Sequence, residues 1–258
     1  MSKTLGTLQK GLDILHAFLA SPEALTIRDL STHSGIPVTS LYRFLHTLEQ
    51  NHYVVRHEAS GKYALGLAAF RLGAHVAKGM DLRRTVQPIL KELAVKTEES
   101  AILTIRDRDK ALCIDCVESA HGIRFSQKIG RAAPINVGAA GKVLLAFMPQ
   151  QERDKLLRGM KFRPARPEAI QDRKALLHRL DQIRKDGYDL SRGELTDGAF
   201  GIAAPILDQS HCAVAAISVS GPKFRLVADW IPRLKNEVLA ACRKASEVTG
   251  SDLVLTAL

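Results

Sequence analysis

Apolar residues recur every three or four positions at the start of the chain, and this spacing predicts an amphipathic first helix. The residues that set the spacing are Leu5, Leu8, Leu12, Leu15 and Leu19. Thr26 is suited to the N-cap of a second short helix, on which Ile27 and Leu30 face inward. A glycine-containing turn at 34–37 then leads into a third helix, and Pro37 fits the first turn of that helix, where its missing N–H costs nothing.

The third helix, over 37–51, carries one apolar face and is followed by two β-like runs, 53–56 and 62–65, in the order of a hairpin. A short helix, a glycine-containing turn and a second helix match the helix-turn-helix unit, whose second helix can enter the major groove of DNA. The hairpin would then be a wing close to the phosphate backbone. This order predicts a winged helix-turn-helix over residues 1–66.

The polar side of the third helix is expected to carry the side chains that read DNA. Hydroxyl groups bind phosphates or base edges, and an arginine can bind guanine through two hydrogen bonds. The residues that fit these roles are Thr39, Ser40, Tyr42, Arg43 and His46 on the third helix, Arg56 and Lys62 on the hairpin, and Thr26 and Arg28 at the start of the second helix. Any three-helix domain exposes polar residues, so this pattern alone leaves DNA binding open.

The hydrophobic pattern changes near residue 80. Residues 67–99 are mostly helical, with a joint at Gly79, and alternating runs follow. Strands are expected at 101–105, 111–117, 122–129, 201–207 and 213–219, and helices at 139–147, 150–158, 172–186 and 226–248. The chain is therefore expected to be an α+β protein, with a DNA-binding domain at 1–66, a linker helix at 67–80 and a larger domain at 81–258.

Small residues mark a candidate anion site in the larger domain. Residues 138–141 (Gly-Ala-Ala-Gly) open an apolar helix, and the backbone N–H groups at a helix start favour an anion such as a carboxylate. Ser218 and Ser220 alternate with apolar residues, so both hydroxyls point to one face of a strand. A phosphate-binding loop is excluded, because Asn136 stands where that motif needs glycine and Val143 where it needs Ser or Thr.

Catalytic and redox motifs are weaker. The sequence has no Gly-x-Ser-x-Gly around either serine and no His-x-x-x-His pair, and we expect no metal and no cofactor. Cys113 and Cys116, with His121 nearby, have a spacing that zinc can use. In a regular strand, however, residues i and i+3 point to opposite faces, so we expect core or cavity thiols. Two alternatives stay open: an enzyme that acts on a small acid, with an interaction module at 1–66, and a thiol or metal sensor.

Composition and charge narrow the class of protein. The 258 residues are 46% apolar and 25% charged, the balance of a globular protein. The chain has neither an apolar run of about 18 residues nor a signal-peptide pattern, so we expect a cytoplasmic protein with no membrane partner. The net charge of +10 favours a polyanionic partner. Residues 1–66 hold six Lys/Arg against five Asp/Glu, whereas 153–192 hold twelve against six, so charge does not locate a DNA surface.

Motifs in both halves of the chain belong together in one known family. In the first half they are Ser34-Gly35-Ile36-Pro37, Thr39-Ser40, Tyr42-Arg43-Phe44-Leu45 and Gly61-Lys62-Tyr63. In the second half they are Ala140-Gly141-Lys142, Gly187-Tyr188, Glu194, Ile202-Ala203-Ala204-Pro205 and Ser218-Val219-Ser220-Gly221-Pro222. Their order along nearly the whole chain resembles the IclR-type bacterial transcriptional regulators. Val38 departs from the family, which often has Lys there, and 136–138 (Asn-Val-Gly) replaces a more usual His-Ala-Thr or His-Ala-Ser.

The resemblance implies a ligand-controlled DNA-binding regulator. Its winged helix-turn-helix would be joined by the linker helix to a C-terminal α/β effector-binding domain of the GAF/PAS-like type. The effector positions that it implies are Gly138, Ala139, Ala140, Ser191, Gly201, Ser218 and Ser220. It also implies two partners besides a small carboxylate effector: double-stranded operator DNA, and further copies of the chain, in homodimers that pair into tetramers.

Two of these positions bear on the size of the effector. The family often has an acidic residue at Ser191 and a cysteine or small residue at Gly201. Here Ser191 is a neutral hydrogen-bonding group, and Gly201 leaves extra volume. We therefore expect a small organic acid that is bulkier than a two- or three-carbon acid.

Overall fold

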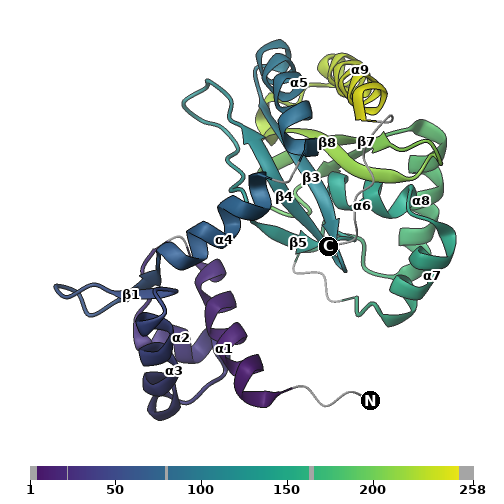
Figure 1. Cartoon of the computed structure of the whole chain (residues 1–258). Helices are drawn as coiled ribbons and strands as arrows, with labels where there is room; N and C mark the ends of the chain where they lie inside the picture. Colours follow the sequence, from purple (N-terminus) through teal and green to yellow (C-terminus); the bar gives the residue numbers. More distant parts are fainter. Residues whose placement is uncertain (1–4, 22, 79–80, 163–165, 250–258) are drawn as a thin grey trace. The chain divides into compact units, whose positions relative to one another are not determined.

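The structure, a computed structural model, describes residues 5–21, 23–78, 81–162 and 166–249 (Figure 1). The chain divides into two compact units, Met1–Met80 and Asp81–Leu258, which we call the head unit and the body unit. The joint expected at Gly79 lies outside the described residues.

The described part of the head unit consists of four helical segments, a hairpin and a further helix. In order these are α1 (Gly6–Ala17), η1 (Phe18–Ala20), α2 (Ile27–Ser34), α3 (Val38–Gln50), β1 (Val54–Arg56), β2 (Tyr63–Leu65) and α4 (Leu67–Lys78). The two strands pair antiparallel, with Arg56 opposite Tyr63. Buried residues from all of the elements before α4 form one core, which includes Ile14, Phe18, Leu30, Leu41, Leu45, Val54 and Tyr63.

The first helix forms as predicted, and Leu15 packs against this core, but other leucines of the predicted stripe do not. Leu5, Leu8 and Leu12 are 75%, 60% and 42% exposed, whereas Ile14 and Phe18 are buried. Helical spacing identifies a helix and its apolar side, but that side can face a partner as well as the core of its own unit. The stripe therefore leaves an apolar surface on the head unit.

The turn between α2 and α3 follows from local backbone chemistry. Thr26 and Asp29 form a capping box at the start of α2, in which each side chain accepts a backbone N–H of the other residue. Gly35 ends α2 at a φ of +70°, a left-handed conformation that favours glycine. Pro37 is the N-cap of α3, so this helix begins one residue later than predicted. The two helices of the helix-turn-helix unit are thus fixed by three short signals in the sequence.

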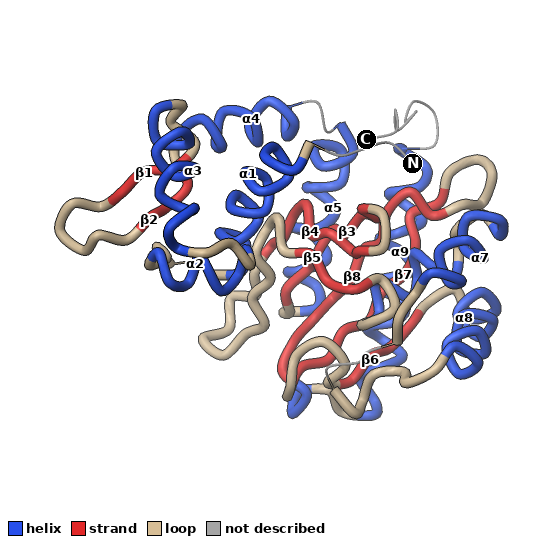
Figure 2. The backbone as a smooth tube through the Cα atoms, turned by 90° about the horizontal axis from the view of Figure 1, so that it is seen from below, coloured by secondary structure: helices blue, strands red, loops and turns tan. Residues whose placement is uncertain are grey.

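The body unit is built on one antiparallel sheet of six strands in the order β5-β4-β3-β8-β7-β6 (Figure 2). The strands are β3 (Ser100–Asp107), β4 (Lys110–Val117), β5 (Ala132–Pro134), β6 (Asp189–Arg192), β7 (Ala199–Leu207) and β8 (Ala213–Pro222). The helices are α5 (Asp81–Thr97), α6 (Ala139–Ala146), α7 (Gln150–Gly159), α8 (Arg173–Asp186) and α9 (Ile231–Thr249). Two single turns, η2 (Lys223–Arg225) and η3 (Ala228–Trp230), precede the last helix.

Helices cover both faces of this sheet. α5 and α9 pack against each other on one face, and α6 packs on the other with α8 against it (Figure 1). Ala203 and Ala216 face α6 and share a core with Val143 of α6 and Leu180 of α8. Small side chains on the strands allow α6 to approach the sheet closely. Together the units confirm the predicted fold class, a helix-turn-helix unit followed by an α/β unit.

Several elements of the body unit, β5 among them, differ from the prediction. Residues 122–129 do not form a strand, because the edge position beside β4 is taken by β5, where Ala132 pairs with Leu112. The sequence does not predict β6, which is only four residues long and largely polar. The last helix begins at Ile231 rather than 226, and Pro232 in its first turn suits this start. Among the described helices, none is both long and apolar enough to cross a bilayer.

Candidate functional site

A cavity, which we call the α6 pocket, lies between the sheet and the start of α6. Its space, open solvent included, is about 630 Å³, and it is lined by residues of the sheet, of the start of α6 and of two loops. The residues that the sequence assigns to an effector all line it: Gly138, Ala139, Ala140, Ser191, Gly201, Ser218 and Ser220. The structure therefore brings together residues from α6, β6, β7 and β8 that are up to 82 positions apart, from 138 to 220.

The strand register explains how three serines reach one cavity. Ser220 of β8 lies opposite Gly201 of β7, and Gly201 lies opposite Ser191 of β6. Residues that lie opposite each other on neighbouring strands share a face of the sheet, so Ser220, Gly201 and Ser191 lie on one face. Ser218 lies on the same face, because it is two residues before Ser220 on the same strand. A Cβ atom at Gly201 would stand 3.2 Å from Ser220 Oγ, so glycine keeps a gap between two hydroxyls. All three serines are buried, and their hydroxyls make no hydrogen bond to another described residue.

The start of α6 supplies backbone donors to the same cavity. Gly138 is the N-cap at a φ of +77°, and a Cβ atom at Gly141 would overlap the carbonyl oxygen of Ile135. The first N–H groups of a helix have no partner inside it, so Ala139 and Ala140 present donors to the pocket. The N–H of Gly138 is different, because it donates to Glu194 Oε2 at 3.1 Å. The predicted anion site therefore has fewer free donors than the sequence implies.

A buried ion-pair network supports this wall of the pocket. Lys142, which is only 2% exposed, contacts the carboxylate of Glu194 and lies 3.1 Å from Asp189 Oδ2. Asp189 also accepts a hydrogen bond from Arg179 Nε at 2.8 Å. Two positive and two negative groups close the network, so Glu194, the one charged residue lining the described pocket, is already paired. The pocket is consequently close to neutral. In the sequence, the sign of this ion-pair network is Lys142, a charged residue among the apolar residues of the predicted helix.

The residues predicted to contact DNA lie on several elements of the head unit. Thr39, Tyr42, Arg43 and His46 are exposed on α3 and Ser40 is half-buried there, while Arg28 and Arg56 are exposed and Lys62 is half-buried. Thr39 and Arg43 are one turn apart and so are Tyr42 and His46, which gives two adjacent rows along the helix. The guanidinium of Arg56 lies 5.7 Å from the centre of the Tyr63 ring, which positions its charge on the hairpin.

Thr26 is an exception among these residues. Its hydroxyl donates to Asp29 Oδ2 at 2.7 Å, and its backbone N–H donates to the same oxygen at 2.9 Å. Both donors of Thr26 are therefore used in the capping box, and neither is left for a phosphate oxygen. The structure thus gives Thr26 a capping role, and its contact with DNA stays a prediction.

Two sequence models of one family match the chain. The IclR helix-turn-helix domain matches residues 7–58, and the model described as bacterial transcriptional regulator IclR C-terminal matches residues 74–247. The chain belongs to the IclR family of bacterial transcriptional regulators. The second match makes the body unit the effector-binding domain of this family, which confirms the resemblance seen in the sequence motifs.

Individual relatives agree with this assignment. The chain is 31% identical to HTH-type transcriptional regulator KipR of Bacillus subtilis, over 95% of this chain and 97% of that protein. It is also 31% identical to HTH-type transcriptional regulator KdgR of Escherichia coli, over 96% and 94%. Because these IclR-family relatives are named as regulators, we assign the chain to transcriptional regulation and not to catalysis.

Solved structures of the IclR family share the fold. An IclR transcriptional regulator from Alicyclobacillus acidocaldarius has a TM-score of 0.80 at 24% identity, over 96% of this chain and 100% of that one. An IclR homologue from Microbacterium hydrocarbonoxydans, complexed with 4-hydroxybenzoate, has a TM-score of 0.77 at 20% identity, over 93% and 97%. At these identities the likeness shows the fold.

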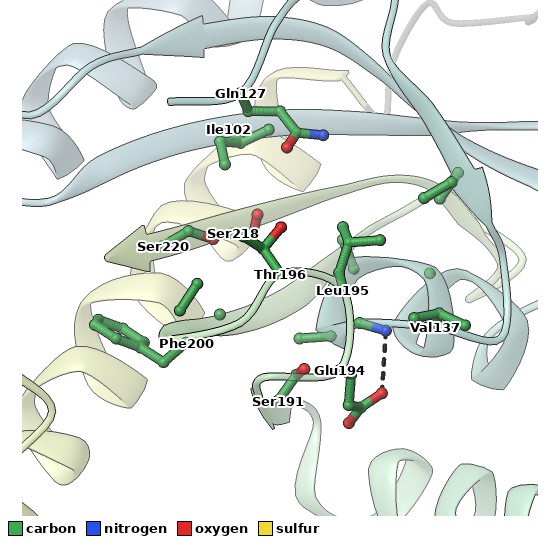
Figure 3. A pocket seen from close by; sticks show the side chains of 18 of the residues that line it. Ile102, Gln127, Val137, Ser191, Glu194, Leu195, Thr196, Phe200, Ser218 and Ser220 are labelled. Atoms are coloured by element: carbon green, nitrogen blue, oxygen red, sulfur yellow. Dashed lines mark hydrogen bonds between the residues drawn. The ribbon is translucent and has the colours of Figure 1, made fainter. Parts of the chain in front are cut away.

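Loops of this IclR-family chain supply pocket residues that the sequence did not single out. Phe125 and Gln127 come from the loop after β4, and Leu195 and Thr196 come from the loop between β6 and β7 (Figure 3). Gln127 Oε1 and Thr196 Oγ1 are buried, and neither has a hydrogen-bond partner among the described residues. Spacing could not reveal them, because an irregular loop has no period that ties a residue to a face.

The cysteine pair corrects one geometric expectation for this IclR-family chain. Cys113 lies opposite Thr104 and Cys116 opposite Ile102, and the register shifts between these pairs. The bulge in β4 therefore places the two cysteines on one face of the sheet and not on opposite faces. Burial raises the pKa of Cys113 to about 12, so its thiol stays protonated at neutral pH. In the described part of the chain, no group of three or more His, Cys, Asp or Glu side chains could hold a metal ion.

Proposed function

We propose that the chain binds operator DNA through the head unit and that a small carboxylic acid in the α6 pocket controls this binding. One observation carries the proposal: Ala139 and Ala140, at the start of α6, line a cavity that three buried serines also line, and the hydroxyls of these serines have no partner in the described chain. A carboxylate accepts several hydrogen bonds and is favoured by the positive end of a helix. The ion-pair network supports this choice, because the carboxylate of Glu194 is neutralised by Lys142.

The body of the acid is expected to be apolar and larger than two or three carbons. Ile102, Leu195 and Phe200 line the pocket beside the polar groups and offer apolar contacts to such a body. The missing side chain at Gly201 adds room between Ser191 and Ser220. The 4-hydroxybenzoate held by the Microbacterium homologue supports an acid of this size.

We propose that residues 1–66 form the domain that recognises DNA, that residues 67–80 form a linker helix, and that residues 81–258 form the domain that binds the effector. Helix α3 would enter the major groove, with Arg43 able to bind a guanine through two hydrogen bonds, and Arg56 and Lys62 would approach the phosphate backbone. A ligand can shift DNA binding only through a difference in its affinity for two arrangements of the protein. The linker helix is the element that would differ between them.

We propose a homodimer, and a pairing of dimers, as the form that binds DNA. Apolar side chains on the outside of the head unit support a second copy as partner: Leu5, Leu8 and Leu12 around α1, and Leu67, Phe70, Leu72 and Val76 on α4 are all exposed. Such surfaces mark interaction sites when they are contiguous. Two related heads would read half-sites about 34 Å apart or at a multiple of that distance.

The test combines selection of DNA with a ligand screen. Duplexes are selected from a random pool with the full chain, and a thermal-shift screen of carboxylic acids, with 4-hydroxybenzoate included, finds binders that raise Tm. We expect the selected duplex to be two-fold symmetric, and the affinity of the chain for this duplex to change when the acid is added. Deletion of residues 1–66 should abolish DNA binding and leave acid binding intact. A strictly monomeric chain that enriches no duplex would contradict the proposal.

A further inference from the structure

The α6 pocket has polar groups that the carboxylate would not use. Gln127 Oε1 and Thr196 Oγ1 both line the cavity, and each atom is buried without a hydrogen-bond partner among the described residues. In Figure 3 the amide of Gln127 enters the cavity on the side opposite Ser191. Buried polar atoms are usually paired, so two unpaired atoms in one cavity indicate a place for a ligand group.

The loop that carries Gln127 is held in place by side chains from elsewhere in the body unit. Ser100 Oγ donates to the carbonyl of Phe125 at 2.5 Å, and Arg225 Nη1 donates to the carbonyl of Ile123 at 2.8 Å. Arg225 is itself fixed by two hydrogen bonds, of 2.6 and 2.7 Å, to the fully buried carboxylate of Glu99. The position of Gln127 is therefore set before a ligand arrives, as a specificity group requires.

The chemistry of the two atoms defines the group that would meet them. An amide oxygen only accepts hydrogen bonds, whereas a hydroxyl can donate or accept. The missing partner of Gln127 Oε1 is therefore a donor on the ligand. An ammonium group is disfavoured, because the carboxylate of Glu194, the one charged group lining the described pocket, is already paired with Lys142. A neutral hydroxyl satisfies Gln127 and can accept from Thr196.

We propose that Gln127 and Thr196 are specificity-determining residues that select acids carrying a hydroxyl group remote from the carboxylate. This inference rests on the proposed function, because it takes the carboxylate to lie at the start of α6. The inference adds that the effector has a second polar group, at the end remote from the carboxylate. A site built to bind a hydroxyl discriminates strongly against the analogue that lacks it, since the protein groups would then stay buried and unpaired.

The experiment uses matched pairs of acids on the full chain. Calorimetry measures Kd for benzoate and 4-hydroxybenzoate, and for hexanoate and 6-hydroxyhexanoate, with the wild type, Gln127→Leu and Thr196→Val. Gln151→Leu, an exposed residue of α7, is the matched control. We expect at least one hydroxy acid to bind about tenfold more tightly than its partner acid. Gln127→Leu should remove most of this ratio, Thr196→Val part of it, and Gln151→Leu none.

The outcomes separate the two claims. If acids bind without preference for the hydroxyl, or if the preference survives both pocket variants, the roles of Gln127 and Thr196 are overturned and the acid site stands. If no acid of either kind binds the wild type, the proposed carboxylate site itself is overturned, and this inference with it. Circular dichroism and Tm of each variant check that a lost preference does not come from a lost fold.

Discussion

The head unit and the body unit position their candidate functional side chains in different ways. In the head unit, Thr39, Arg43 and His46 come from the exposed side of one helix, and their common side follows from the helical period alone. In the body unit, the lining of the α6 pocket comes from a helix start, from all six strands β3 to β8, and from two loops. These residues meet only because the sheet pairs in one register.

This difference predicts how each site responds to substitution. A side chain on the exposed side of α3 can change without loss of core packing, so its effect should be confined to DNA binding. Substitution of a buried residue in the wall of the α6 pocket leaves another buried side chain without its partner. Such a substitution should reduce both the stability of the body unit and ligand binding. The predictions below test this contrast, in order of expected effect.

Lys142→Met should destabilise the body unit most. Lys142 is buried between Glu194 and Asp189, and its loss leaves buried carboxylates without their cation. Removal of one partner from a buried ion pair costs about 3–5 kcal/mol in free energy of unfolding. Urea denaturation of the full chain, followed by circular dichroism, measures this loss.

Lys155→Met is the control, because Lys155 is exposed on α7 of the same unit and should change the free energy of unfolding by less than about 0.5 kcal/mol. If Lys142→Met and Lys155→Met were equally stable, the ion-pair network would not stabilise the wall of the α6 pocket. The contrast between the units would then be lost.

Arg43→Ala should weaken specific DNA binding by about 1–3 kcal/mol, with little change in stability. Arg43 is exposed on α3, so truncation removes no buried contact. Fluorescence anisotropy with a selected duplex measures the affinity, and urea denaturation measures the stability. Arg43→Lys is the matched variant, because it keeps the charge but loses the two-pronged geometry that guanine needs. If Arg43→Lys binds as tightly and as selectively as the wild type, Arg43 contacts phosphate and not a base.

The same contrast explains what the sequence could predict. Local signals were sufficient for the head unit: Gly35 and Pro37 mark the turn between its two reading helices. They did not reveal which side of α1 packs inward, because Leu8 and Ile14 are equally apolar and only the tertiary contacts separate them. Spacing therefore predicts elements better than it predicts their partners.

For the α6 pocket, the sequence indicated the serines and the start of α6, and the family resemblance added Ser191 and Gly201. It did not reveal the pairing of Lys142 with Glu194, which depends on the approach of a loop 52 residues away. The bulge in β4 reversed the expected faces of the cysteines, because one extra residue changes the alternation without a mark in the sequence.

Thr26→Ala should have the smallest effect, a loss of about 1 kcal/mol in the stability of the head unit. Thr26 caps α2 and holds Asp29, and its hydrogen bonds lower the pKa of the Asp29 carboxyl below the usual 3.8. Because this pKa is lowered in the folded state, the contribution is present above pH 3.8 and is lost as the pH falls through the folded value. Urea denaturation at pH 7 and near pH 3 measures both effects.

Thr26→Ser separates the cap from a contact with DNA. Serine keeps the capping hydroxyl, so Thr26→Ser should retain the stability and the DNA affinity of the wild type. Thr26→Ala should lose stability, and the affinity of its folded fraction for DNA should stay within about twofold, because the donors of Thr26 already serve Asp29. A large loss of affinity at full stability would restore Thr26 to the DNA-binding surface. It would also show that even in the head unit, where spacing predicts so much, one side chain can serve the fold and the ligand at once.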